Sequence, residues 1–135
     1  MSGNAERHRL HDLCHAGRLK QVKEYLANDP NAIMSINEPA GVFGYTPLHE
    51  AVSSRNANIL RLLLTYGGLV DALSNGNYTP LHIAASIGDV ECIKVLLEYN
   101  ASISRVDEFG KTPFATAQLN KRKKAARLLK TAGKF

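Results

Sequence analysis

The chain alternates apolar stretches with short polar breaks, in a pattern typical of amphipathic helices. Two stretches carry large aliphatic residues three and four positions apart, as one face of a helix requires. They contain Ile59, Leu60, Leu62, Leu63 and Leu64 in one case and Val90, Ile93, Val95, Leu96 and Leu97 in the other. Each follows a segment rich in small residues, with breaks at Arg55 and Asn56 and at Gly88 and Asp89. The pattern predicts helix pairs whose second helix supplies most of the core.

The helix pairs recur at a fixed interval. TPLHEA starts at Thr46, TPLHIA at Thr79 and TPFATA at Thr112, so the two intervals between successive starts are equal. An upstream copy lacks Thr-Pro but places Leu10 and His11 where the later copies have Leu-His. The chain therefore contains about four copies of one unit, and such units gain stability by stacking on one another.

The residues of the motif have a mechanical meaning. Thr46 and Thr79 suit the N-cap of a helix, where the hydroxyl accepts a hydrogen bond from a free amide. Proline suits the next position, because it lacks a donor that would find no partner there. The histidines His49 and His82 then fall at the third helical position, from which the imidazole reaches back to the cap or across to a neighbouring unit. We predict that both histidines are structural.

The period and the TPLH motif resemble those of the ankyrin repeat family, over nearly the whole chain. The resemblance implies an all-α solenoid of stacked helix-turn-helix units with β-turn or hairpin fingers. It predicts a polar N-terminal tail at residues 1–7 and an ankyrin-repeat domain at residues 8–135, with repeats at about 8–45, 46–78, 79–111 and 112–135. The finger tips would fall at Gly44, Asn77 and Gly110, residues that tolerate a positive φ.

The first unit is longer than the others, since the interval from His8 to Thr46 exceeds that from Thr46 to Thr79 by five residues. We place the five extra residues in an enlarged finger at residues 36–43, where Pro39 and Gly41 favour turns. Two interpretations stay open, a tolerated loop insertion and a finger that contacts a partner.

The family resemblance implies a non-catalytic protein-protein interaction module, an adaptor or scaffold that binds a protein or peptide through its concave face and finger tips. The candidate partner-binding residues are Phe43, Tyr45, Glu50, Ser53, Ser54, Asn75, Tyr78, Ile83, Ile87, Glu108, Phe109 and Lys111. Aromatic residues beside carboxylates suit a peptide with an apolar anchor and some positive charge. The alternative for Tyr45 and Tyr78 is that they only pack one finger against the next.

The net charge of +5 is concentrated at one end of the chain. Residues 1–120 hold 10 basic and 12 acidic residues, a balance of −2, whereas residues 121–135 hold seven basic residues and no acidic one. The basic patch consists of Lys121, Arg122, Lys123, Lys124 and Arg127. The patch fits the solvent-exposed outer face of the helix that closes the stack. Positively charged side chains are also favourable near the C-terminus of a helix, because of the helix dipole. The alternative function is a nuclear module that binds chromatin or nucleic acid through this patch.

Other classes of function find no support in the sequence. We see no phosphate-binding loop, nucleophile elbow or metal-ligand spacing, and we therefore expect no catalytic residue, no metal site and no cofactor. Cys14 and Cys92 form no CxxC pair and are expected to be buried free thiols. No apolar run approaches the roughly 20 residues that span a bilayer, so no membrane partner is expected. The start of the chain lacks a secretory h-region, which favours an intracellular protein, cytoplasmic or nuclear and monomeric by itself.

Overall fold

The computed structural model describes residues 8–133, so the polar tail predicted at residues 1–7 lies outside the described part of the chain. Within that part the regular structure is helical. The helices are α2 (Arg9–His15), α3 (Leu19–Asn28), α4 (Pro30–Met34), α5 (Pro47–Ser53), α6 (Ala57–Thr65), α7 (Pro80–Ile87), α8 (Val90–Glu98), α9 (Pro113–Leu119) and α10 (Lys123–Ala132). The described residues form no strand, only an isolated antiparallel bridge between Ala40 and Tyr45.

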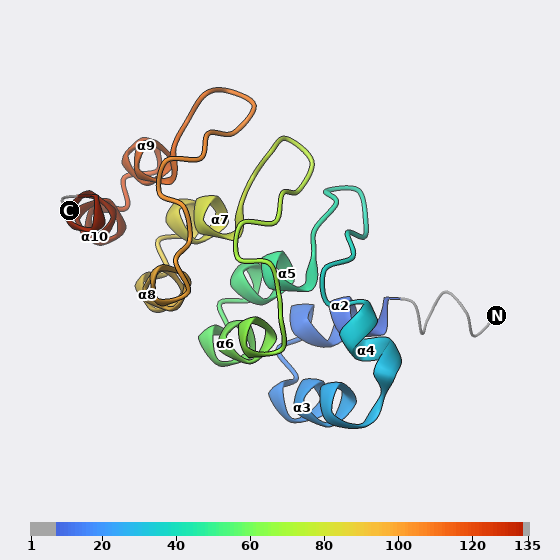
Figure 1. The fold of residues 1–135 in the computed structure, drawn as a ribbon. Coiled ribbons are helices and arrows are strands. Elements are labelled where there is room, and N and C mark those ends of the chain that lie inside the picture. The colour runs from blue at the N-terminus through green and yellow to red at the C-terminus, as the bar shows by residue number, and fades with distance from the viewer. Residues whose placement is uncertain (1–7, 134–135) are drawn as a thin grey trace.

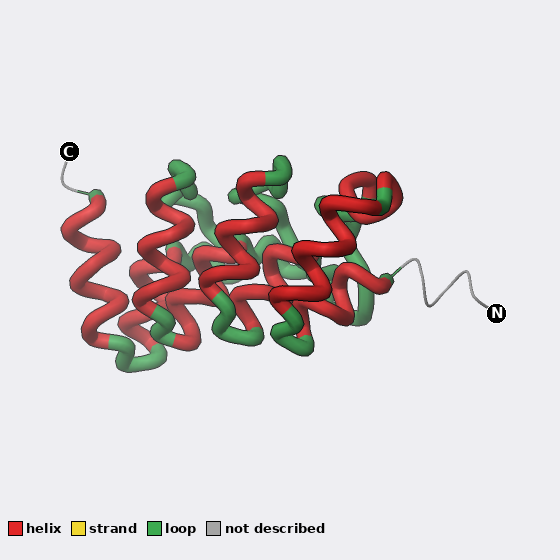
Figure 2. Tube along the Cα trace, turned by 90° about the horizontal axis from the view of Figure 1, so that it is seen from below, coloured by secondary structure: helices red, strands yellow, loops and turns green. Residues whose placement is uncertain are grey.

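The helices form two rows. Helices α2, α5, α7 and α9 make one row and α3, α6, α8 and α10 the other, and each helix contacts its neighbours along its row and its partner across the rows (Figure 1). The loops between helix pairs project to the side of the first row as fingers. Seen from below, the pairs form an elongated stack with α10 at its C-terminal end (Figure 2). This confirms the predicted all-α solenoid.

The first helix of each later pair begins at the predicted threonine. Thr46, Thr79 and Thr112 are N-caps, each followed by proline at the first helical position. The hydroxyl of Thr79 accepts a hydrogen bond from the backbone N–H of His82 at 3.2 Å. Thr112 accepts in the same way from the N–H of Ala115, also at 3.2 Å. The caps explain why these helices begin where they do.

The motif histidines join each repeat to the next finger. The backbone N–H of Thr46 donates to Nδ1 of His49, so the ring proton resides on Nε2, which donates to the carbonyl of Tyr78 at 2.8 Å. His82 makes the same pair of contacts, ending on the carbonyl of Lys111 at 2.8 Å. In the first repeat, Nε2 of His11 donates to a finger carbonyl at 2.6 Å. The predicted structural role of His49 and His82 is confirmed, and His11 makes the same kind of contact.

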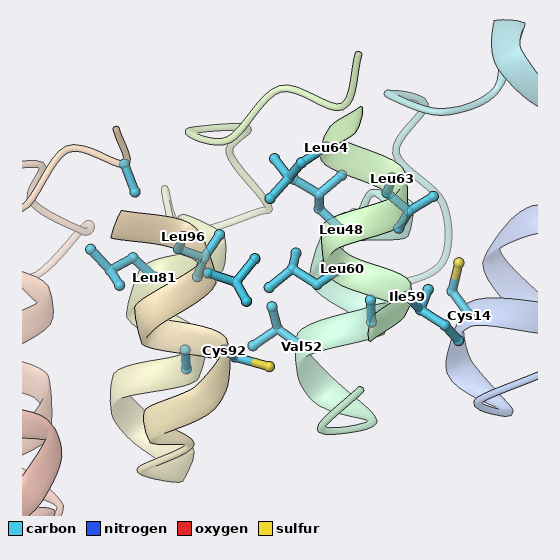
Figure 3. Packing of buried hydrophobic residues seen from close by; sticks show 14 of the residues in the cluster. Cys14, Leu48, Val52, Ile59, Leu60, Leu63, Leu64, Leu81, Cys92 and Leu96 are labelled. Atoms are coloured by element: carbon cyan, nitrogen blue, oxygen red, sulfur yellow. The ribbon is translucent and has the colours of Figure 1, made fainter. Parts of the chain in front are cut away.

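The core runs between the rows, where leucine and isoleucine side chains of consecutive repeats meet (Figure 3). Its fully buried members include Leu48, Ile59, Leu60, Leu63, Leu81, Ile93 and Leu96. Leu62, Val90 and Leu97 of the predicted stripes are only half-buried. Cys14 and Cys92 are free and buried, as predicted, and burial raises the pKa of the Cys14 thiol to about 12.

The finger tips have the predicted backbone. Gly44, Asn77 and Gly110 adopt φ values of +65°, +62° and +76°. Glycine and asparagine are the residues that enter this left-handed region at least cost, which explains their recurrence at one register position.

The extra residues of the first repeat lie mainly outside the finger, so the predicted enlarged finger at residues 36–43 is largely wrong. Oδ1 of Asn37 accepts from a backbone N–H in the next loop at 2.8 Å, as Oδ1 of Asp71 does at 3.0 Å, so these two residues share a register. The distance along the chain from this shared position to the last residue of the finger is eight residues in the first repeat (37 to 45). In the second repeat it is seven residues (71 to 78). The finger thus gains one residue, and four of the five belong to the segment containing α4. That helix is capped by Asp29, which accepts from the N–H of Asn31.

Candidate functional site

A groove of about 410 Å³ runs across the first helices of three consecutive repeats. Its lining residues are Tyr45, Ser53, Tyr78, His82, Ile83, Ser86, Ile87 and Thr116. They come from α5, α7 and α9 and from the bases of two fingers, and we call the hollow the first-helix groove. The structure brings together here five of the predicted partner-binding residues, namely Tyr45, Ser53, Tyr78, Ile83 and Ile87.

The two tyrosines pack on the histidines of their own repeats. The ring of Tyr45 stacks on His49 with centroids 5.3 Å apart, and Phe43 lies 5.5 Å from Tyr45 on the finger. Tyr78 meets His82 edge to face at 6.1 Å. These ring contacts lie within single repeats, which differs from the interpretation that the tyrosines pack finger against finger. Both tyrosines are half-buried, so part of each ring remains accessible from the groove.

The phenols are hydrogen-bond donors at neutral pH. Burial, and after it the charge of Glu50, raises the pKa of Tyr45 above its ordinary value. Loss of solvent also raises the pKa of Tyr78, with Asp107 and Glu108 acting in the same direction. Both hydroxyls therefore keep their protons and can donate to a carbonyl of a bound peptide.

Thr116 contributes a hydroxyl without a partner. The residue is 9% exposed, and its Oγ1 is buried with no hydrogen-bond partner among the described residues. A buried hydroxyl left unpaired is unfavourable by roughly 1–3 kcal/mol. Glu50, Ile83 and Thr116 hold equivalent positions in three consecutive repeats. Thr116 therefore lines the groove with the rest of its side chain, and its hydroxyl oxygen is turned away from solvent.

Sequence reasoning did not select Thr116, His82 or Ser86 as binding residues, although all three line the groove. A signal existed for Thr116, since the repeat register aligns it with Ile83, which was selected. His82 was predicted to be structural, and its ring does hydrogen-bond to the backbone of Thr79 and Lys111. It also forms part of the groove lining.

Several predicted residues lie outside the groove and contact the scaffold. The hydroxyl of Ser54 donates to the carbonyl of Cys14 at 3.0 Å. Asn75 joins two fingers, because its side-chain amide donates to the carbonyl of Val42 at 2.9 Å and its backbone N–H donates to the preceding finger. Lys111 supplies the carbonyl that accepts from the neighbouring histidine.

Glu50 lies in a neighbouring hollow of about 290 Å³ near the N-terminal end of the stack. This hollow is lined by His8, His11, Asp12, His15, Ala40, Gly41 and Glu50. A carboxylate oxygen of Glu50 is 2.8 Å from Nδ1 of His15. The predicted acidic character therefore adjoins the first-helix groove at one end.

The remaining predicted residues sit on the finger tips. Phe43 is 65% exposed and Phe109 is 68% exposed, and Glu108 is exposed beside the latter. The backbone N–H of Glu108 donates to the carbonyl of Gly76 on the preceding finger at 2.9 Å, which fixes the tip. The tips present accessible aromatic surface away from the groove lining.

The basic patch does not suit the helix dipole as predicted. Helix α10 begins at Lys123, so Lys121, Arg122, Lys123 and Lys124 lie at its N-terminus, where the dipole favours negative charge. The argument from a helix C-terminus is therefore wrong for these four residues, because the patch comes at the start of the closing helix and not at its end. All five residues of the patch, Arg127 included, are exposed.

The described residues contain neither a metal-binding cluster nor a membrane-spanning helix. From residue 8 to residue 133, no group of three or more His, Cys, Asp or Glu side chains is arranged to hold a metal ion. Among the helices of the same range, none combines the length and the apolar character needed to cross a membrane.

The comparisons with known proteins agree with this architecture. A family model described as ankyrin repeats (3 copies) matches residues 10–107 and matches again at residues 68–134. The matched residues extend over both the first-helix groove and the basic patch. A comparison with curated proteins found no match.

Proposed function

Because the chain belongs to the ankyrin repeat family, whose repeats are generally protein-protein interaction modules, we propose that it is a non-catalytic adaptor. Its binding site is the first-helix groove, and its ligand is an exposed segment of a partner protein. The finger tips, with Phe43 and Phe109, extend the contact beyond the groove.

The mixed lining of the groove is the observation that supports this site best, because half-buried tyrosine and isoleucine side chains and serine hydroxyls from consecutive repeats face one hollow. The hydroxyls of Ser53 and Ser86 line the same groove. A peptide backbone offers both donors and acceptors to such a row.

The apolar lining indicates the anchor. Ile83 and Ile87 come from one helix, and Tyr78 stands at its base, so a large apolar side chain would contact all three. Aromatic and aliphatic contacts of this kind carry much of the energy of protein interfaces. Glu50 at one end and Glu108 on a finger favour a ligand that also carries positive charge.

Ile87→Glu is the variant that tests the groove. Ile87 is half-buried at the end of α7, so a carboxylate there places a charge in the apolar part of the groove without removing a core side chain. Affinity capture from a cell extract, read by quantitative mass spectrometry, should recover a partner with the wild type and at least about tenfold less with the variant.

Leu69→Glu is the matched control. Leu69 is also apolar, is 60% exposed and does not line the groove, so the same charge change there should leave capture intact. Thermal denaturation should show both variants folded. Equal capture by the wild type and Ile87→Glu would refute the proposed site.

A further inference from the structure

A second groove, of about 570 Å³, is lined by residues of α9, of α10 and of the turn between them. These two helices form the C-terminal end of the described stack (Figures 1 and 2). We call this second groove the terminal groove. Its lining residues are Phe114, Gln118, Lys121, Arg122, Lys123, Ala126, Arg127 and Lys130. None of them belongs to the first-helix groove, so the two surfaces are separate.

The floor of the terminal groove is apolar because it occupies register positions that are core elsewhere. Phe114 holds the position of Leu81 in the preceding repeat, and Ala126 holds that of Ile93. Leu81 and Ile93 are fully buried, whereas Phe114 and Ala126 are half-buried. The groove therefore exposes surface that is covered by neighbouring helices in the inner repeats.

The rim of the terminal groove is cationic, and its charges are unpaired. No carboxylate within residues 8–133 forms an ion pair with Lys121, Arg122, Lys123, Arg127 or Lys130. Unpaired cations gathered around one hollow create a positive potential that attracts anionic ligands.

Arg122 is held in place on this rim. Its Nε donates to the carbonyl of Ser86 at 3.0 Å. Its aliphatic stem lies against Gly88, where an added Cβ would come within 2.8 Å of the Arg122 Cδ. The guanidinium is thus positioned by the preceding repeat, and ordering it for a ligand requires little further loss of side-chain freedom.

The N-terminus of α10 adds to the positive potential. Its N-cap residue is Arg122, which gives no side-chain cap, and its first turn holds no acidic residue. Of the equivalent helices, α6 and α8 are capped by Asn56 and Asp89, whose side chains accept from backbone amides, whereas α3 has no side-chain cap. The free amides of α10 and the dipole therefore reinforce Lys123 and Lys124 instead of offsetting them.

From the floor and the rim together we propose that the terminal groove binds an acidic peptide segment with a large apolar side chain. The apolar side chain contacts Phe114 and Ala126. The flanking carboxylates pair with Arg122, Lys123 and Arg127 and reach the free amides at the start of α10.

Two other occupants fit less well. A nucleic-acid backbone would satisfy the cations but would leave the floor of Phe114 and Ala126 without an apolar partner. A second copy of the chain stacked head to tail would place α3 next to the groove. This helix and its N-cap residue carry three basic residues and one acidic residue, namely Arg18, Lys20, Lys23 and Glu24. That end is itself positive.

Fluorescence anisotropy with synthetic probes tests the proposal on the full chain. The first probe is the labelled octapeptide Asp-Glu-Glu-Leu-Phe-Asp-Glu-Glu, the second replaces Leu-Phe with Ser-Ser, and the third is a short labelled DNA duplex. We expect the first probe to bind at least about tenfold tighter than either of the others, because only it uses both floor and rim.

Charge reversal on the rim supplies the variant. Lys123→Glu with Arg127→Glu should weaken binding of the first probe by at least about tenfold. The variant should fold well, because an acid in the first turn of α10 suits the dipole. Lys20→Glu with Lys23→Glu is the matched control, which makes the same charge change in the first repeat and should retain binding.

The outcomes separate this proposal from the adaptor function. Equal binding of the two peptides, tighter binding of the duplex, or full binding by the rim variant would each overturn the terminal groove as an acidic-peptide site. Loss of the first probe from Ile87→Glu would also overturn it, since that residue lies in the other groove. Failure of partner capture by the first-helix groove leaves the terminal groove unaffected.

Discussion

Protonation of His49 should destabilise the fold between pH 7 and pH 5. The side chain is fully buried, and burial lowers its pKa from 6.5 to about 4, despite the hydrogen bond to the carbonyl of Tyr78 that acts in the opposite direction. In the unfolded chain the same imidazole titrates near its ordinary value. The unfolded state therefore binds more protons between these two pKa values, and the free energy of unfolding falls as the pH drops through that window.

The magnitude follows from the two pKa values. At pH 5 nearly all unfolded chains carry the proton on His49, whereas most folded chains do not, which lowers the free energy of unfolding by about 2 kcal/mol relative to pH 7. Burial also lowers the pKa of His11, so that residue adds to the loss with the same sign. For a domain of this size the effect is a large fraction of its total stability.

Urea denaturation at several pH values, followed by far-UV circular dichroism, measures the loss. The control is His49→Gln, because glutamine at the third helical position can serve a capping box and does not titrate. The variant should lose about 2 kcal/mol less than the wild type between pH 7 and pH 5. Carboxylate titration is common to both proteins and cancels in the difference. Parallel pH profiles would refute the assignment of the acid sensitivity to His49.

Two further predictions concern the backbone and the thiols. Arg55 has a φ of +59°, at the register position that Gly88 holds in the next repeat, so Arg55→Gly should raise the free energy of unfolding by roughly 0.5–1 kcal/mol in urea titration. Destabilisation would contradict the strain argument. Burial raises the pKa values of Cys14 and Cys92, so a thiol reagent should label the native protein only as fast as it unfolds. Rapid labelling without denaturant would show that these thiols are accessible.

The features that sequence predicts well are those that depend on neighbours along the chain. The Thr-Pro caps at Thr46 and Thr79 and the positive φ at Asn77 follow from local backbone chemistry, and the structure confirms them. Helix α4 carries a signal of the same kind, since Asp29 and Pro30 form a cap and a first helical position. It was overlooked because the extra length of the first repeat was assigned to the finger at residues 36–43, which follows α4 in the chain.

The features that sequence does not supply depend on contacts between repeats. The orphan hydroxyl of Thr116 exists only because no neighbouring group reaches it, which the spacing of residues does not reveal. The start of α10 lacks a local cap signal, because Arg122 is not a capping residue, and the Arg122 side chain instead donates to Ser86 of the preceding repeat. The repeat register aligned the residues that line the first-helix groove. The hollow between them depends on how the helices pack, which the register does not give.

The hydrogen bond from each motif histidine to the next finger also governs how the stack opens locally. If the finger ending at Lys111 frays, Nε2 of His82 loses its acceptor in a buried environment, at a cost of roughly 1–3 kcal/mol. The same holds one repeat earlier for Tyr78 and His49. Opening of one repeat therefore penalises the preceding one, and amide hydrogen exchange in the inner helices should report shared opening events instead of independent ones. A protease that cleaves only opened loops would then gain access to several repeats in a single opening event.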